Sequence, residues 1–139
     1  IAAIRKIQSQ STSNPSSISQ AAAVEALNGT QSFIKKRAKS FSDRRNFVVN
    51  YLNSIPGITC LMPKGAFYVF PSCKGLIGKK TKIKNDTDFV QKLLEKQNVA
   101  VVQGSAFGLD GYFRISYATS MQKLKVAMER IKVFCKSLG

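Results

Sequence analysis

The spacing of apolar residues in this 139-residue chain changes at Pro56-Gly57. From Ser32 to Ser54 the apolar residues recur every three or four positions, which predicts one long helix that the proline and glycine end. After it they form short runs rich in β-branched and aromatic residues, which predict strands at 58–61, 66–70, 99–102 and 112–117. Helices mixed with short strands predict an α/β fold of the two-layer α+β kind, with a short, mainly antiparallel sheet packed against helices.

Three further helices are predicted, over about residues 15–27, 86–98 and 120–138. Capping residues are expected at Asn14, in the stretch Asn85-Asp86-Thr87-Asp88 and at Thr119-Ser120, and Asn14 precedes a proline at the first helical position. Residues 1–6 are typical of the end of a helix, whereas residues 7–18 are polar and rich in serine. Because the chain does not begin with Met, we expect it to be a piece of a longer protein.

The composition excludes several classes of enzyme. The chain has no histidine, so it cannot contain a Ser-His-Asp triad, a Cys-His pair or a His-ligated metal. Its apolar runs are far shorter than the roughly 20 residues that cross a bilayer, and no signal-peptide pattern opens it. We therefore expect no metal and no membrane span.

Three cysteines, Cys60, Cys73 and Cys135, are odd in number and widely spaced. No CxxC pair occurs among them, so neither a zinc site nor a disulfide framework is predicted. This pattern indicates reduced thiols in a cytoplasmic protein.

The formal net charge of +15 raises the alternative of a basic nucleic-acid-binding module. The lysines and arginines fall on polar helix positions or in one loop, and no aromatic motif that stacks on bases accompanies them. Solvated helix faces are the favoured interpretation, so we expect no specific nucleic-acid partner. The basic stretch Gly78–Lys84, which includes Lys79, is the strongest local candidate for an anion contact.

Arg114 is the best candidate for a binding residue. It lies inside an apolar strand after a loop with three glycines, and alternation places Phe113 and Ile115 on the opposite face. A guanidinium needs a charged partner, and its planar fork suits a carboxylate. An internal ion pair with Asp110 or Glu129 and a carboxylate ligand are both compatible with this pattern.

A second motif is Pro63-Lys64-Gly65-Ala66-Phe67-Tyr68. A Lys-Gly turn followed by aromatic residues is common in hairpins. The simplest interpretation is that Phe67 faces the core and Tyr68 is half-exposed.

Three segments occur together in a specific order. They are S-Q-S-T-S-N-P-S at residues 9–16, P-K-G-A-F-Y at residues 63–68 and V-A-V-V-Q-G-S-A-F-G-L-D-G-Y-F-R-I-S-Y-A-T-S at residues 99–120. In order and spacing this set resembles the C-terminal region of class I pyridoxal-phosphate aminotransferases, above all the bacterial aspartate aminotransferases. The resemblance covers nearly the whole chain, and the Gly-rich loop before Arg114 is its most diagnostic part.

The resemblance implies a fold-type I homodimer in which residues 1–30 form the end of the large-domain region with a connecting helix, and residues 31–139 form the small C-terminal domain. It implies that Arg114 holds the α-carboxylate of the amino-acid or 2-oxo-acid substrate and that Phe67 lines the pocket and helps to close it. It also implies that Ser13 and Asn14 lie near the dimer interface and the neighbouring active site.

The chain departs from the family in three respects. Residues 9–12 lack the arginine that reads a distal carboxylate in some aspartate aminotransferases, so that group is read elsewhere or the substrate is not a dicarboxylate. Gln103 stands where relatives often have proline, which costs the loop some rigidity. No lysine among the sixteen has the family's setting for the Schiff base with pyridoxal phosphate, so we expect that lysine upstream and no catalytic residue in this chain.

The resemblance leaves related functions open. An aminotransferase for aromatic amino acids or prephenate, a carbon–sulfur lyase, or a regulator derived from the same fold is compatible with these motifs. We expect the full-length protein to be an aspartate-type aminotransferase and this chain alone to be inactive.

Overall fold

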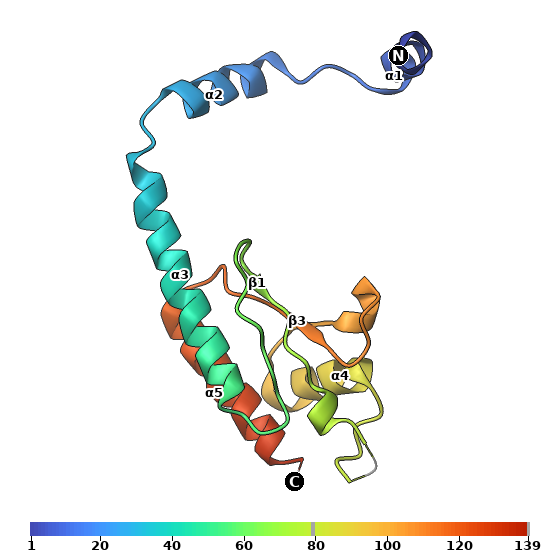
Figure 1. The fold of residues 1–139 in the computed structure, drawn as a ribbon, viewed down its shortest axis with the longest axis vertical. Coiled ribbons are helices and arrows are strands. Elements are labelled where there is room, and N and C mark those ends of the chain that lie inside the picture. Colours follow the sequence, from blue (N-terminus) through green and yellow to red (C-terminus); the bar gives the residue numbers. More distant parts are fainter. Residues whose placement is uncertain (79, 139) are drawn as a thin grey trace. The chain divides into compact units, whose positions relative to one another are not determined.

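A computed structural model describes residues 1–78 and 80–138, so Lys79 of the predicted anion-contact stretch lies outside the described residues. The chain divides into two compact units, residues 1–36 and 37–139 (Figure 1). No helix in the described part of the chain combines the length and the apolarity needed to cross a bilayer.

The first unit contains α1 (Ala2–Ser11) and α2 (Ser17–Asn28), and none of their residues is buried within it. The prediction that the first helix ends by residue 6 is wrong, because residues 7–11 continue α1. The hydroxyl groups of Ser9, Ser11 and Thr12 donate to carbonyl oxygens three or four residues earlier, at 2.7–3.0 Å. Hydroxyl groups that bond back in this way occupy the carbonyls of a helix end instead of opening a turn.

The cap of α2 also differs from the prediction. The N-cap is Ser16, whose Oγ accepts a hydrogen bond from the backbone N–H of Ser19 at 3.2 Å. Asn14 therefore does not cap the helix, and Pro15 lies before its first turn. A serine hydroxyl is one of the preferred N-cap acceptors, which explains why the helix begins after it.

The long helix α3 (Ser32–Asn53) confirms the predicted range to within one residue. Its last two turns bury Val48, Val49 and Leu52 in the core of the second unit. Gly57 then takes a left-handed conformation, with φ of 84°, in the turn that follows the helix.

The sheet has three antiparallel strands in the order β1-β3-β2, with β3 (Phe113–Ser116) in the middle. In β1 (Tyr68–Val69) the residue pairs are Tyr68 with Ser116 and Val69 with Ile115. In β2 (Val102–Gln103) Val102 lies opposite Arg114. The ladder of β2 is shorter than the predicted strand at 99–102 and extends one residue beyond it.

The predicted strand at 58–61 is wrong. Only an isolated bridge forms there, between Thr59 and Ser72. The reason is local: the side-chain amide of Asn53 accepts from the backbone N–H of Cys60 at 2.7 Å and donates to its carbonyl at 2.9 Å. Because a side chain occupies both backbone groups, Cys60 cannot continue a ladder.

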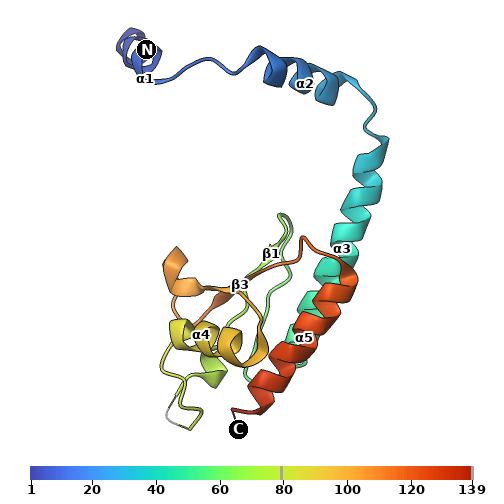
Figure 2. The same cartoon turned by 180° about the vertical axis from the view of Figure 1, so that it is seen from behind.

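Helices α4 (Asp86–Gln97) and α5 (Met121–Lys136) begin at the predicted caps. Asn85 Oδ1 accepts from the N–H of Asp88 at 2.8 Å, and Ser120 Oγ accepts from the N–H of Lys123 at 3.3 Å. The end of α4 is a left-handed Asn98, with φ of 54°. Helix α4 packs against β2 and against α5, and α5 lies beside the C-terminal part of α3 (Figures 1 and 2).

The core of the second unit forms where these elements meet. The Phe89 ring of α4 lies 5.0 Å from the Phe113 ring of β3 and 5.3 Å from the Phe134 ring of α5, and all three residues have no exposed surface. The predicted fold class, helices with a short antiparallel sheet, is confirmed. The division into domains at residue 30 stays a prediction.

Candidate functional site

Arg114 lies on the outer face of the central strand β3, as alternation predicted. Phe113 and Ile115 are buried on the inner face, whereas Arg114 is half-buried and Ser116 is exposed on the other. The strand is therefore held by the core on one side while it presents the guanidinium on the other. A side chain on a packed strand is a rigid support for a ligand contact.

Two aromatic rings flank the guanidinium of Arg114. Its Cζ lies 4.4 Å from the centroid of the Tyr68 ring and 4.3 Å from that of the Phe107 ring. Both distances are well within the range of cation–π contacts. Sequence reasoning did not assign Tyr68 or Phe107 to the site, although both stand in the motifs that carry the family resemblance.

Neither predicted internal partner holds Arg114. The hydroxyl of Tyr51 donates to Glu129, and Asp110 is exposed. Within the part of the chain that the structure describes, the ion pairs are Lys39–Asp43 and Lys92–Asp88, and no hydrogen bond leaves the Arg114 guanidinium. Its N–H donors are therefore available to a ligand, as the carboxylate interpretation requires.

Phe67 is not a core residue, so the simplest interpretation of its motif is wrong. Its side chain is 42% exposed, and its ring lies 4.4 Å from the Tyr68 ring. The cause is the turn before it, where Ala66 has a left-handed φ of 58° and its carbonyl accepts from the Tyr117 hydroxyl at 2.8 Å. Since the Tyr117 N–H also donates to the Phe67 carbonyl at 2.9 Å, the turn is fixed while the Phe67 ring points outward.

The loop that carries Phe107 is fixed to α4 by Asp86, which sequence reasoning treated only as part of a cap. Asp86 is 2% exposed, and its Oδ2 accepts from the backbone N–H of Ser105 at 2.8 Å. The loop forms a 3₁₀ turn, η2 (Gly104–Phe107), and Gly108 reverses the chain with a φ of 76°. In the sequence, the one sign of this contact is an acidic residue directly after the capping Asn85.

The Asp86 carboxylate is charged in this setting. Burial alone would raise its pKa, but hydrogen bonds from the backbone and hydroxyl of Ser105 and from the backbone of Gly111 outweigh it. The pKa of Asp86 therefore lies below its usual value of 3.8. A charged acceptor makes these hydrogen bonds stronger than neutral ones.

Ser13 and Asn14 belong to the first unit. Their side chains are exposed, in a stretch that lines an open hollow of about 570 Å³ formed by residues 9–14. Within the described residues their side chains form no hydrogen bond, so their predicted role stays a prediction.

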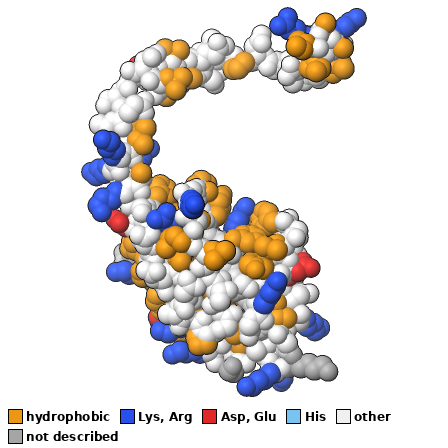
Figure 3. All heavy atoms as spheres, in the orientation of Figure 1, with side chains coloured by type: hydrophobic (Ala, Val, Ile, Leu, Met, Phe, Trp, Pro, Cys, Tyr) orange, Lys and Arg blue, Asp and Glu red, His pale blue; other side chains and the backbone are white. Residues whose placement is uncertain are grey.

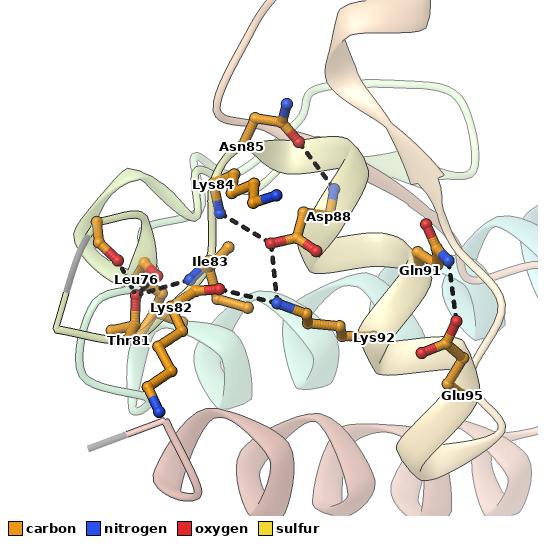
Figure 4. A network of polar contacts seen from close by, with 11 residues as sticks. Leu76, Thr81, Lys82, Ile83, Lys84, Asn85, Asp88, Gln91, Lys92 and Glu95 are labelled. Atoms are coloured by element: carbon orange, nitrogen blue, oxygen red, sulfur yellow. Dashed lines mark hydrogen bonds and ion pairs between the residues drawn. The ribbon is translucent and has the colours of Figure 1, made fainter.

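Hydrogen bonds to residues of α4 hold the described part of the basic stretch at residues 78–84 (Figure 4). Asp88 Oδ2 accepts from the Lys84 N–H at 2.8 Å and from Lys92 Nζ at 3.0 Å, and Lys92 Nζ also donates to the Lys82 carbonyl at 2.8 Å. These bonds lower the pKa of Asp88, with the Lys84 N–H as the largest cause. These contacts join the first turns of α4 to the turn that precedes the helix.

Basic side chains are spread over the visible face of the molecule (Figure 3). Every described lysine is exposed or half-buried. Among residues 1–78 and 80–138 no group of three or more metal-ligating His, Cys, Asp or Glu side chains occurs, and the three cysteines are free and buried.

One hollow of the second unit does not have Arg114 in its wall. It measures about 730 Å³ and lies between α5 and the chain that leads from α4 to β2. Val99, Met128 and Ile131 contribute to its apolar wall, and Arg114 is not among its lining residues. This hollow is therefore separate from the candidate site around Arg114.

The sheet-held arginine, the glycine-rich loop and the mixed helix-and-sheet fold fit one family of enzymes. The family model of aminotransferase class I and II matches residues 1–131. The chain belongs to the class I and II aminotransferase family.

Individual members of this family are similar to the chain in sequence and in structure. The chain is 58% identical to the aspartate aminotransferase of Rhizobium meliloti (strain 1021) over 143 residues, covering 100% of this chain and 35% of that protein. It is also 58% identical to a probable aspartate/prephenate aminotransferase of Rhizobium leguminosarum bv. phaseoli, covering 97% and 35%. The crystal structure of the Rhizobium meliloti aspartate aminotransferase matches with a TM-score of 0.87 and 59% identity over 94% of this chain and 34% of that one.

The chain thus spans about a third of the length of these relatives. The resemblance to aminotransferases of fold type I is confirmed, and the alternative of a nucleic-acid-binding module is not favoured.

Proposed function

We propose that the full-length protein carrying this chain is an aspartate-type aminotransferase that uses pyridoxal phosphate. It transfers an amino group between an amino acid and a 2-oxo acid. Family membership supports the reaction class, and the names of the similar proteins support aspartate as a substrate. Residues 31–139 serve as its small domain, and residues 1–30 connect them to the large domain.

Arg114 binds the α-carboxylate of the substrate in this proposal. The observation that supports it is the guanidinium on the outer face of β3, which lies between two rings and has no carboxylate partner in the described residues. The fork of a guanidinium donates two parallel hydrogen bonds to a carboxylate, which fixes the direction of the bound substrate. Arg114 thereby orients the substrate and performs no proton transfer.

Phe67 lines the substrate pocket from the neighbouring turn. Its exposed ring contacts Tyr68, which contacts Arg114, so Phe67 lies next to the proposed carboxylate site. An apolar ring at this place excludes water from the bound substrate when the site closes.

The described residues give no support for a cofactor lysine within this chain. No described lysine is buried, and none lines a hollow together with Arg114. We therefore assign the cofactor lysine to the part of the enzyme outside this chain. When bound, the cofactor supplies an electron sink for the carbanion at the substrate Cα.

The replacement of Arg114 by alanine in the full-length enzyme tests the proposal. A charge-assisted hydrogen-bonded contact contributes about 1.5–3 kcal/mol, so kcat/KM is expected to fall by about tenfold to a hundredfold or more. Arg114→Lys keeps the charge without the fork and should recover only part of that loss. Cofactor absorbance should be unchanged in both variants, whereas an unchanged kcat/KM in Arg114→Ala would refute the role.

The substrate range is the second question, because the relatives include aspartate and aspartate/prephenate aminotransferases. Residues 9–12 contain no arginine to read a distal carboxylate, so we propose that another part of the enzyme reads it. A comparison of kcat/KM for aspartate, an aromatic amino acid and prephenate distinguishes the two specificities. A preference for the uncharged aromatic substrate would reject the aspartate assignment.

We also propose that the full-length enzyme is a homodimer, with Ser13 and Asn14 near the interface and the neighbouring active site. Both residues are exposed and form no hydrogen bond within the described part of the chain, so their polar groups are free to meet another surface. Light scattering on the full-length protein tests the dimer. A monomeric mass at micromolar concentration would contradict it.

A cytoplasmic location completes the proposal. The three cysteines are free and buried, as is usual in a reducing compartment. Fractionation of cells that express the full-length protein tests this location.

A further inference from the structure

The guanidinium of Arg114 lies close to two aromatic rings. The Tyr68 ring lies 4.4 Å from its Cζ and the Phe107 ring 4.3 Å from it. A ring that contacts the π-face of a guanidinium leaves the N–H donors, which lie in its plane, free to bond. Within the described residues those donors form no hydrogen bond or ion pair.

The two rings come from separate elements. Tyr68 belongs to β1 and pairs with Ser116, so it lies diagonally opposite Arg114 on the outer face of the sheet. Phe107 ends the 3₁₀ turn η2, which follows the opposite edge strand β2. The arrangement therefore exists only when both edge strands are in register with β3.

The Phe107 ring is itself supported. It meets the Phe70 ring edge-on, with centroids 5.9 Å apart and planes at 76°, and Phe70 stacks on Tyr112 at 5.9 Å. The bond from the Ser105 N–H to Asp86 fixes the same turn to α4. These contacts restrict where the Phe107 ring can lie, although its side chain is 48% exposed.

We infer that Tyr68 and Phe107 are positioning residues, which hold the Arg114 plane in the orientation that receives a carboxylate along its edge. The inference rests on the proposed function of Arg114. An arginine side chain loses considerable rotational freedom when it is fixed, and the rings impose this loss before the substrate arrives. The rings thus strengthen substrate binding without touching the reacting atoms.

The test uses the full-length enzyme with Tyr68→Leu and Phe107→Leu. Each replacement removes one cation–π contact and is expected to raise KM about tenfold, with kcat nearly unchanged. The ring-retaining variants Tyr68→Phe and Phe107→Tyr should keep the KM of the native enzyme. Leu94→Ala is a matched control, because Leu94 is an equally exposed apolar residue, at 48%, on α4.

The same replacements in the Arg114→Ala background separate this inference from the proposed function. If the rings act through Arg114, they have no further effect on KM once it is gone. An Arg114→Ala enzyme with native kcat/KM would refute the proposed function and this inference with it. If Arg114→Ala is impaired but the leucine variants keep the native KM, or raise it equally in both backgrounds, only the positioning role is wrong. Phe107→Leu is decisive if Tyr68→Leu does not fold, because Phe107 is exposed.

Discussion

The buried carboxylate of Asp86 makes a prediction that can be worked out in detail. Asp86→Ala removes the acceptor of the Ser105 N–H and leaves that donor without its partner. Hydrogen bonds to a charged group contribute about 1.5–3 kcal/mol each, and a negative charge in the first turn of a helix adds about 0.5 kcal/mol. The free energy of unfolding of the second unit is therefore expected to fall by about 3 kcal/mol.

The conservative variant Asp86→Asn keeps the shape and one acceptor oxygen, so about half of that loss is expected. Urea unfolding of the full-length protein measures the change, and amide hydrogen exchange at Ser105 and Gly111 locates it in the loop. The reasoning fails if Asp86→Ala changes the free energy by less than about 0.5 kcal/mol and leaves exchange at Ser105 as slow as before.

The pH dependence provides a second check on Asp86. The pKa of Asp86 in the folded protein lies below 3.8, so its charge stabilises the folded state. This stabilisation is fully present at a pH above the pKa that Asp86 has in the unfolded chain. This contribution is lost as the pH falls through the lower, folded-state pKa. The difference in stability between the native protein and Asp86→Asn should therefore shrink as the pH is lowered below about 4, and a difference that grows in acid would show the sign to be wrong.

Three further predictions follow from individual contacts. Asn53→Ala is expected to lower the free energy of unfolding, measured in urea, by about 1–2 kcal/mol, because both backbone groups of Cys60 lose their partner. An unchanged free energy would mean that water fully replaces the amide. Gly104→Ala places a Cβ 2.8 Å from the Tyr112 Cβ and closer still to the Leu109 carbonyl oxygen. This overpacking should lower the free energy of unfolding by about 1–3 kcal/mol. A melting temperature equal to that of the native protein would contradict the crowding. Burial raises the pKa of Cys60 to about 11 and the pKa of Cys73 and Cys135 to about 12. A thiol reagent at pH 8 should therefore label none of the three before the protein unfolds. Rapid labelling of the native protein would contradict their burial.

Local chemistry made several features predictable from the sequence. Asn85 and Ser120 cap their helices as predicted, because a capping side chain bonds to a backbone group only three residues away. The alternation in β3 placed Arg114 opposite the buried Phe113, because the side-chain period of a strand is two in any sheet. The family motifs then predicted that this residue takes part in substrate binding.

Other local patterns were ambiguous, because a nearby group competed for the backbone. The apolar run at 58–61 has a strand-like composition, yet the side chain of Asn53 occupies both backbone groups of Cys60. The hydroxyl groups near the end of α1 bond to helix carbonyls, although serine is just as common in turns. Composition cannot decide which of two available partners a backbone group takes.

The sequence by itself determined helices α3, α4 and α5, the face of β3 that carries Arg114 and the family. Only the tertiary structure decided that Arg114 lies between Tyr68 and Phe107 and away from Asp110 and Glu129. The physical reason is that periodicity fixes the side of a strand on which a residue lies, whereas its neighbours on that side depend on the register of strands far apart in the chain. Residues 68 and 107 reach position 114 only after both edge strands have paired with β3.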